Sequence, residues 1–258
     1  MTILVTGATG KVGGQVVSQL SVPVRRFARS TGGDITNVDS VRAALDGVSS
    51  VFLVWPFFHT DGVEPIIDAI ASSSARRIVY LSSAGDPDWA LGVEELIEKS
   101  GLEWTFLRPT GFAGNALQWA PEIRASGVVR APFGAMPRSS IHEYDMAAVG
   151  VRALLSDSHV GAKYLLSGPS LVTQVEQVRI IGEVIGRELR FEEQPAEEAK
   201  AEMLAAGWPE PVANGALASW AASIAHPEPV TSTVEDVTGR PAKTFREWAE
   251  DHADDFKP

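Results

Sequence analysis

The chain contains no cysteine among its 258 residues. A sequence without thiols excludes a disulfide framework, a cysteine nucleophile and a thiolate metal site, and it suits a reducing compartment. Long apolar runs are also missing, because the longest, Val51–Phe58, is too short to cross a bilayer. An apolar strand begins almost at Met1, which leaves no room for a secretory signal. We therefore expect a cytoplasmic protein with no membrane partner.

Positive charge is scarce, with 22 Lys and Arg against 33 Asp and Glu and a formal net charge of -11. Such a chain repels a phosphate backbone, so we expect no nucleic-acid partner. The five histidines lie far apart, and His142-Glu143 lacks the second histidine of a zinc motif. No Gly-x-Ser-x-Gly elbow occurs, so neither a metal site nor a serine hydrolase is predicted.

Tyrosine is rare as well, and its spacing excludes one mechanism. In typical short-chain dehydrogenases a tyrosine protonates the carbonyl oxygen and a lysine four positions later lowers its pKa. The residues at that spacing after Tyr80, Tyr144 and Tyr164 are Ala84, Ala148 and Gly168. The sequence therefore does not support the usual alcohol and ketone chemistry.

Glycine, by contrast, is concentrated where the first strand ends. The apolar run Ile3–Val5 leads into Thr6-Gly7-Ala8-Thr9-Gly10-Lys11-Val12-Gly13, and a helical pattern follows. Gly7 permits a tight turn, Gly10 permits close approach of phosphate oxygens, and Gly13 permits close packing of the helix on the sheet. The helix N-terminus then offers N–H groups to a diphosphate. This spacing predicts a dinucleotide site, and a turn without a ligand is the alternative.

Strands and helices alternate along the first part of the chain. We predict strands at Ile3–Thr6, Val22–Ala28, Ser50–Val54, Arg77–Leu81 and Trp104–Leu107, and helices at Lys11–Leu20, Val38–Leu45, Asp61–Ser74 and Gly92–Ser100. Helical connections of this length indicate an α/β, doubly wound parallel sheet of the Rossmann type. We assign residues 1–110 to this core and 111–258 to a small, mostly helical lobe interleaved with it. Within the lobe, residues 145–168 carry a helix at Asp145–Leu155 and a strand at Lys163–Leu166, and they return to the sheet.

The C-terminal part has helix-start signals. Capping boxes are predicted at Thr173 with Glu176, Ser232 with Glu235, and Thr244 with Glu247. Asp145 is expected to cap the helix that follows it. Pro-Glu-Pro-Val occurs at Pro209–Val212 and at Pro227–Val230, and a proline at a helix start explains each copy.

Several motifs together resemble a known family. They are Thr6–Gly13, Val51–Pro56, Tyr80–Ser83, Leu107–Phe112 with Asn115, and Val237–Trp248. The chain is similar to atypical short-chain dehydrogenases/reductases of the NmrA-like, NAD(P)-binding type, in register over nearly its whole length. That family includes NADPH-dependent quinone, azo-dye and triphenylmethane-dye reductases, and also redox sensors that bind the dinucleotide without turnover.

The end of the second strand indicates which dinucleotide binds. An NAD site normally places Asp or Glu there, whereas an NADP site places a cation and small hydroxyl groups near the 2′-phosphate. This chain has Arg29 and Ser30 at that point and no carboxylate before Asp34. We therefore predict NADPH as the preferred cofactor with NADH possible; a solvated basic strand end is the alternative. Relatives have a longer segment between the Arg29 and Asp34 positions, so the adenine side of the site is expected to be open or rebuilt.

The resemblance extends the cofactor site. It implies adenine contacts at Asp34 and Ile35, ribose and diphosphate contacts near Val54, Trp55 and Pro56, and nicotinamide contacts from Ser82, Ser83, Pro109, Thr110, Gly111 and Phe112. Together with the predicted loop residues Gly7, Thr9, Gly10, Lys11, Val12, Gly13, Arg29 and Ser30, these form the predicted cofactor-binding set.

No catalytic residue is identified from the sequence. Residues in or near segments expected to border the nicotinamide are candidates for the acceptor pocket: Trp55, Ser83, Phe112, Asn115, Trp119 and His142. Each aromatic side chain has core packing as its alternative role. His142 titrates in a range that suits a proton donor, and a surface or capping role is its alternative.

We expect an NADPH-dependent reductase of an electrophilic aromatic acceptor such as a quinone, because such acceptors need mainly a well-placed hydride. One alternative is an NAD(P)-binding sensor that regulates a protein partner without turnover. The other is a biosynthetic tailoring enzyme with a narrow substrate. The expected partner is a small-molecule substrate, with the chain a monomer or homodimer.

Overall fold

The computed structural model describes residues 1–257, and their contacts divide the chain into two compact units. Each unit is assembled from separate stretches of the chain. The first unit comprises Met1–Thr110, Glu143–Leu166 and Thr231–Pro241. The second comprises Gly111–His142, Ser167–Val230 and Ala242–Pro258, of which the structure describes the residues up to 257.

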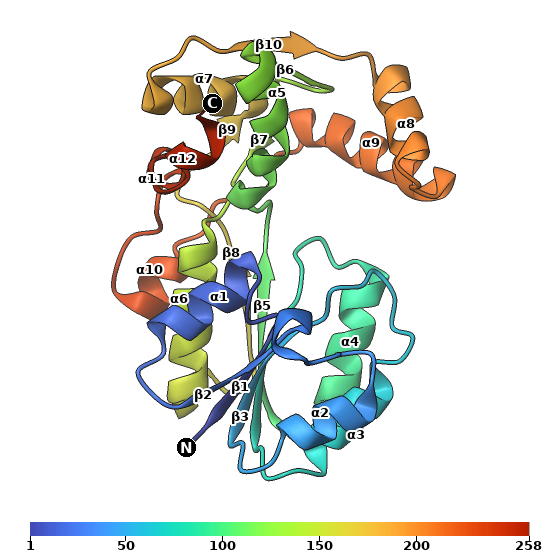
Figure 1. Ribbon diagram of the computed structural model, residues 1–258, viewed down its shortest axis with the longest axis vertical. Coiled ribbons are helices and arrows are strands. Elements are labelled where there is room, and N and C mark those ends of the chain that lie inside the picture. Colours follow the sequence, from blue (N-terminus) through green and yellow to red (C-terminus); the bar gives the residue numbers. More distant parts are fainter. Residues whose placement is uncertain (258) are drawn as a thin grey trace. The chain divides into compact units, whose positions relative to one another are not determined.

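A six-stranded parallel sheet is the centre of the first unit (Figure 1). Its order is β2-β1-β3-β4-β5-β8, and each strand pairs in parallel with its neighbours. The strands are β1 (Ile3–Thr6), β2 (Val24–Phe27), β3 (Ser50–Val54), β4 (Arg77–Leu81), β5 (Glu103–Pro109) and β8 (Ala162–Leu166). This sheet confirms the predicted Rossmann-type fold.

Helices cover both faces of the sheet. On one face α1 (Lys11–Gln19) packs against α6 (Glu143–Leu155), with α10 (Thr233–Thr238) beside α6. The other face carries α2 (Val38–Ala44), α3 (Glu64–Ala71) and α4 (Asp88–Lys99) (Figure 1). Because both faces are covered, the middle of the central strand β3 is apolar, and Val51, Phe52 and Leu53 are fully buried.

The second unit contains most of the remaining helices. Its elements are η2 (Ala113–Trp119), α5 (Ala120–Ser126), β6 (Val128–Ala131), β7 (Pro137–Arg138), β9 (Val172–Thr173), α7 (Gln174–Ile185), β10 (Arg190–Glu193), α8 (Ala196–Ala205), α9 (Glu210–Ala225), α11 (Phe245–Asp251) and α12 (Ala253–Phe256). β6 pairs with β10, and β7 pairs with β9. The core of this unit gathers Trp119, Ile123, Val129, Val178 and Trp248. Within residues 1–257, no helix is both long and apolar enough to cross a bilayer.

Some predicted helix boundaries were wrong for local reasons. α4 starts at Asp88, ahead of the predicted Gly92, because Pro87 takes the extended N-cap position. α3 starts at Glu64 because Gly62, with φ +81°, turns the chain just before it. The short 3₁₀ helix η3 (Asp157–His159) of the first unit had no sequence signal that we recognised.

Two capping boxes are confirmed and one is wrong. Thr173 with Glu176 and Thr244 with Glu247 bond reciprocally, as predicted. Ser232 donates its hydroxyl to Asp236 and makes no cap bond to the backbone. Asp145 is also not a cap, because α6 already begins at Glu143.

The two Pro-Glu-Pro-Val copies have different roles. Pro209 is the N-cap of α9, which confirms the helix start proposed for the first copy. The second copy, Pro227–Val230, starts no helix, because α10 begins later, at Thr233.

Candidate dinucleotide and acceptor site

The glycine loop joins β1 directly to the start of α1. Gly7 has φ +60°, and a Cβ on Gly13 would lie only 2.2 Å from the carbonyl oxygen of Gly7. A Cβ on Gly10 would lie 3.2 Å from the same oxygen. Gly10 is the N-cap of α1, and the first turn of this helix contains no acidic residue. The loop therefore has the cradle that a diphosphate requires, with the positive end of α1 directed at it.

The cradle lies where the strand order reverses. β1 has β2 on one side and β3 on the other, so the chain changes direction between β1 and β3. Thr6 Oγ1 accepts a hydrogen bond from the N–H of Val54 at 2.7 Å, which joins the carboxyl ends of these two strands. A Cβ on Gly7 would lie 3.2 Å from Val54 Cβ. Ligands of open α/β sheets bind in this position, and Trp55 and Pro56 follow immediately.

A short 3₁₀ turn, η1 (Arg29–Thr31), takes the place of the longer segment expected from the family. The Ser30 hydroxyl donates to Thr9 Oγ1 at 3.1 Å, which connects this turn with the glycine loop. The turn ends at Gly32 with φ +82°, and the ring of Phe27 lies so close to Gly33 that a Cβ would be 2.7 Å from it. The shortened connection is therefore a compact, hydrogen-bonded turn.

Arg29 begins this turn with an exposed side chain. Among residues 1–257, no carboxylate lies within ion-pair distance of its guanidinium. The neighbouring Arg25 is different, because it donates to the carbonyl oxygens of Ala44 and Asp46 at 2.8 and 2.6 Å. Arg25 thus closes the end of α2, whereas Arg29 is available to an external anion.

The two residues predicted to contact adenine have contrasting surroundings. Asp34 accepts hydrogen bonds from the hydroxyl and N–H of Thr36, and these bonds, with a smaller effect from the charge of Arg29, lower the pKa of its carboxyl group. Ile35 is half-buried and packs against the core cluster of the first unit. Asp34 is therefore a charged residue that orders its own turn, and Ile35 supplies apolar surface beside it.

The carboxyl ends of β4 and β5 carry the other first-unit residues of the predicted set. The hydroxyl of Ser82 donates to Glu94 at 2.5 Å, while Ser83 is half-buried with its hydroxyl near the Ala84 carbonyl. Pro109 accepts from the N–H of Ala84, and the N–H of Thr110 donates to Leu166. These bonds fix the backbone at the edge of the sheet that holds the glycine loop.

Sequence reasoning missed the partners of Ser82. Glu94, on α4, is almost fully buried, and it receives Arg108 through Nε at 2.9 Å and Nη2 at 2.5 Å. Arg108 also pairs with Asp86 at 3.0 Å, and the bond to Glu94 is the main reason its pKa is raised. The available signal was Glu94 itself, a carboxylate on the same face of the helix as Val93 and Ile97.

The remaining predicted residues belong to the second unit. Gly111 and Phe112 pair with the segment at Ile141, whose N–H donates to Gly111. Asn115 is exposed. Trp119 is buried in the core of this unit, so core packing, the alternative role considered for its side chain, is what the structure shows. The structure thus separates an accessible amide from a packed indole.

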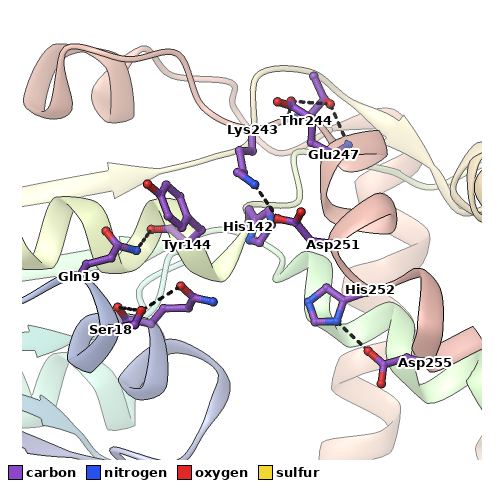
Figure 2. Close-up of polar contacts among 11 residues, drawn as sticks. Ser18, Gln19, His142, Tyr144, Lys243, Thr244, Glu247, Asp251, His252 and Asp255 are labelled. Carbon is purple, nitrogen blue, oxygen red and sulfur yellow. Dashed lines mark hydrogen bonds and ion pairs between the residues drawn. The ribbon is translucent and has the colours of Figure 1, made fainter.

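His142 is buried and lies in a polar cluster of the second unit (Figure 2). Its Nε2 atom is 3.2 Å from Asp251 Oδ2, and Lys243 Nζ is 2.5 Å from the same oxygen. Lys243 first, and His142 next, lower the pKa of Asp251. His252 lies nearby with its ring stacked on Trp248. These contacts hold α11 in its unit, and the role of His142 as a proton donor stays a prediction.

All three tyrosines lie in the first unit. Tyr80 is fully buried, and burial raises the pKa of its hydroxyl. The Tyr144 hydroxyl accepts from Arg240 at 3.1 Å, and the Tyr164 hydroxyl lies 2.8 Å from His159 Nδ1. Among residues 1–257, no group of three or more His, Cys, Asp or Glu side chains is placed to hold a metal ion.

Comparison with known proteins identifies the family of this chain. Residues 7–157 match the family model described as NAD(P)H-binding. The chain is 39% identical to a (4-alkanoyl-5-oxo-2,5-dihydrofuran-3-yl)methyl phosphate reductase of Streptomyces griseus, with 99% of each chain covered. It is 32% identical to an NAD(P)H azoreductase of Xenophilus azovorans, covering 98% of this chain and 99% of that one.

Solved structures agree on the fold. An NADPH-dependent quinone oxidoreductase from Escherichia coli, crystallised with NADPH, has a TM-score of 0.79 at 22% identity and covers 96% of this chain and 99% of that one. The Citrobacter triphenylmethane reductase, complexed with NADP(H), has a TM-score of 0.78 at 22% identity and covers 98% and 100%. The chain belongs to the NAD(P)H-binding family and is an NAD(P)H-dependent oxidoreductase.

Proposed function

We propose that this chain reduces an electron-poor, flat conjugated acceptor, such as a quinone, with NADPH as its preferred cofactor. A bound NADPH supplies a hydride, and the proton that completes the reduction comes from solvent. The observation that carries the proposal is the glycine cradle at the switch point, combined with the absence of a lysine four positions after any tyrosine. An acceptor that is already electrophilic does not need that proton donor.

The chain's own residues have distinct roles in this proposal. Gly7, Gly10 and Gly13 admit the diphosphate to the N-terminus of α1, while Arg29 and Ser30 bind the 2′-phosphate. Val54–Pro56 border the ribose, and Ser82, Ser83, Pro109 and Thr110 border the nicotinamide. Asp34 and Ile35 flank the adenine. The backbone bonds at β4 and β5 orient this edge of the sheet, and that orientation is the main catalytic contribution.

The names of the relatives support a conjugated acceptor. The azoreductase and the quinone oxidoreductase are named for electron-poor π systems. The Streptomyces relative is named for a methyl phosphate whose ring alkene carries an alkanoyl and an oxo group, so that alkene is electron-poor although the molecule as a whole is an anion. A narrow biosynthetic substrate of that type is therefore a second candidate within the same reaction class.

An anaerobic assay of NADPH oxidation tests the proposal. We expect turnover with menadione and a simple azo dye, much slower turnover with NADH, and none with simple ketones. With NADP⁺ in place of NADPH, simple secondary alcohols should likewise not be oxidised. Ketone reduction faster than quinone reduction would contradict the proposed chemistry. Tight NADPH binding with no oxidation by any acceptor would instead identify a sensor without turnover.

A further inference from the structure

A pair of aromatic rings, one exposed and one half-buried, lies in the first unit outside its core cluster. Phe58, in the loop after β3, is 85% exposed. Its ring lies edge-to-face against Trp89, in the first turn of α4, with the centroids 5.6 Å apart and the planes at 82°. A phenyl ring left so open contributes little to folding, because burial is the source of apolar stabilisation. The pair therefore calls for an explanation other than packing.

Three contacts hold the loop that carries Phe58. The indole N–H of buried Trp55 donates to the carbonyl oxygen of His59 at 2.8 Å. The ring of Phe57 lies edge-to-face on Trp55, with the centroids 5.0 Å apart. Thr60 lies against Gly92 of α4, where a Cβ would come within 2.8 Å of its methyl group. Glycine is unfavourable inside a helix, and this close approach explains its presence there. The loop thus has a defined place on α4.

The pair lies at the cofactor edge of the sheet. Residues 55–60 follow the carboxyl end of β3, and residues 82–89 follow the carboxyl end of β4. The carboxyl ends of parallel strands meet at one edge, which here also holds the glycine loop between β1 and α1. Phe58 is three residues beyond Trp55, and only residues 84–88 separate Trp89 from Ser83. The rings therefore belong to the segments that border the proposed dinucleotide site.

The charged residues near Phe58 and Trp89 indicate which kind of ligand ring the pair can bind. Segments 55–62 and 82–92 contain Asp61, Asp86 and Asp88, but no lysine or arginine. Arg108, which approaches Asp86, is already paired with Glu94. An apolar, aromatic surface with an acidic border favours an uncharged flat ring and disfavours an anionic one.

We propose that Phe58 and Trp89 form an acceptor platform on which the uncharged conjugated ring of the hydride acceptor stacks. This inference rests on the proposed reductase function and identifies the residues that select its substrate. The stacked ring covers the exposed face of Phe58, which the fold leaves open, and lies beside the segments that border the nicotinamide.

Binding measurements without turnover test the platform. Menadione is titrated into the complex of the protein with NADP⁺, for wild type, Phe58→Ala, Trp89→Ala and the ring-preserving Phe58→Tyr. Loss of one aromatic contact should raise the dissociation constant of menadione by about five- to thirtyfold in each alanine variant. Phe58→Tyr should stay close to wild type. NADPH affinity should be unchanged in every variant, since the rings are not assigned to the cofactor.

Val160→Ala is the matched control, because Val160 is 43% exposed but precedes β8, at the amino edge of the sheet. Unchanged menadione affinity in both alanine variants would overturn the platform, and so would an equal loss of NADPH affinity. A sulfonated naphthoquinone should bind wild type more weakly than menadione, and tighter binding would contradict the acidic border. Wild type that binds NADPH but neither binds nor reduces any acceptor would instead refute the reductase function itself.

Discussion

Replacing Arg29 with alanine should weaken NADPH and leave NADH almost untouched. Only NADPH carries the 2′-phosphate, and Arg29 is the exposed cation at the end of β2; among the described residues no carboxylate lies within ion-pair distance of it, although its charge helps to lower the pKa of Asp34. A hydrogen bond to a charged group contributes on the order of 1.5–3 kcal/mol. The dissociation constant of NADPH should therefore rise by roughly ten- to a hundredfold. Because Arg29 is exposed, the lower end of that range is expected at physiological salt.

Fluorescence or calorimetric titration of both nucleotides measures this effect. Arg26→Ala is the appropriate control, since Arg26 is an exposed arginine within β2, before its last residue Phe27. Arg25 is unsuitable, because its guanidinium holds the end of α2. Wild-type affinity for NADPH should fall as salt is raised, and the Arg29→Ala variant should lose most of that dependence. Equal losses for NADPH and NADH would refute the reasoning, and no loss would place the 2′-phosphate elsewhere.

Three further predictions concern the cradle, the tyrosines and the second unit. Gly10→Val should abolish binding of both nucleotides in a folded protein, because a branched side chain would occupy the space through which the diphosphate approaches the backbone. Retained binding, measured by titration, would refute the assignment of the glycine loop as the diphosphate site. Tyr80→Phe should keep reductase activity and leave the melting temperature equal or higher, since its buried hydroxyl has no partner among residues 1–257, whereas a large loss of turnover would reveal a missed proton donor. Phe substitutions at Tyr144 and Tyr164 should likewise keep most activity. Lys243 lowers the pKa of Asp251, so the ion pair between them stabilises the fold at pH values above the ordinary carboxyl pKa. This stabilisation is lost as the pH falls through the lowered pKa of Asp251. Lys243→Met should therefore lower the melting temperature by at most about 3 °C at neutral pH and by less in acid, and a larger loss in acid would contradict that sign.

The fold was predictable because its signals are local and repeated. β1, β3 and β4 are short, mainly apolar runs, each followed by a helical pattern, and the glycines at positions 7, 10 and 13 mark the first connection. Short strands such as β7 and β9, with two residues each, have no such pattern. They exist because distant segments meet, which a local reading does not detect.

The candidate site was predictable only in part for the same reason. The backbone cradle at Gly7–Gly13 follows from glycine spacing, whereas the bonds from Ser82 and Arg108 to Glu94 depend on how α4 packs against β4 and β5. Ser232 illustrates the opposite error. The spacing of Ser232 to Glu235 fits a capping box, but the carboxylate of Asp236 is a competing acceptor, and the Ser232 hydroxyl donates its hydrogen bond to that carboxylate.

A single-turnover experiment tests the central claim most directly. The protein is loaded with NADPH, carrying hydrogen or deuterium at the transferable ring position, and mixed anaerobically with menadione. The account predicts loss of NADPH in step with formation of the hydroquinone, with a slower rate for the deuterated cofactor, and the same behaviour in the Tyr80→Phe, Tyr144→Phe and Tyr164→Phe variants. Stable NADPH in the presence of menadione and the azo dye, or a reaction abolished by one of those tyrosine substitutions in a folded protein, would contradict it.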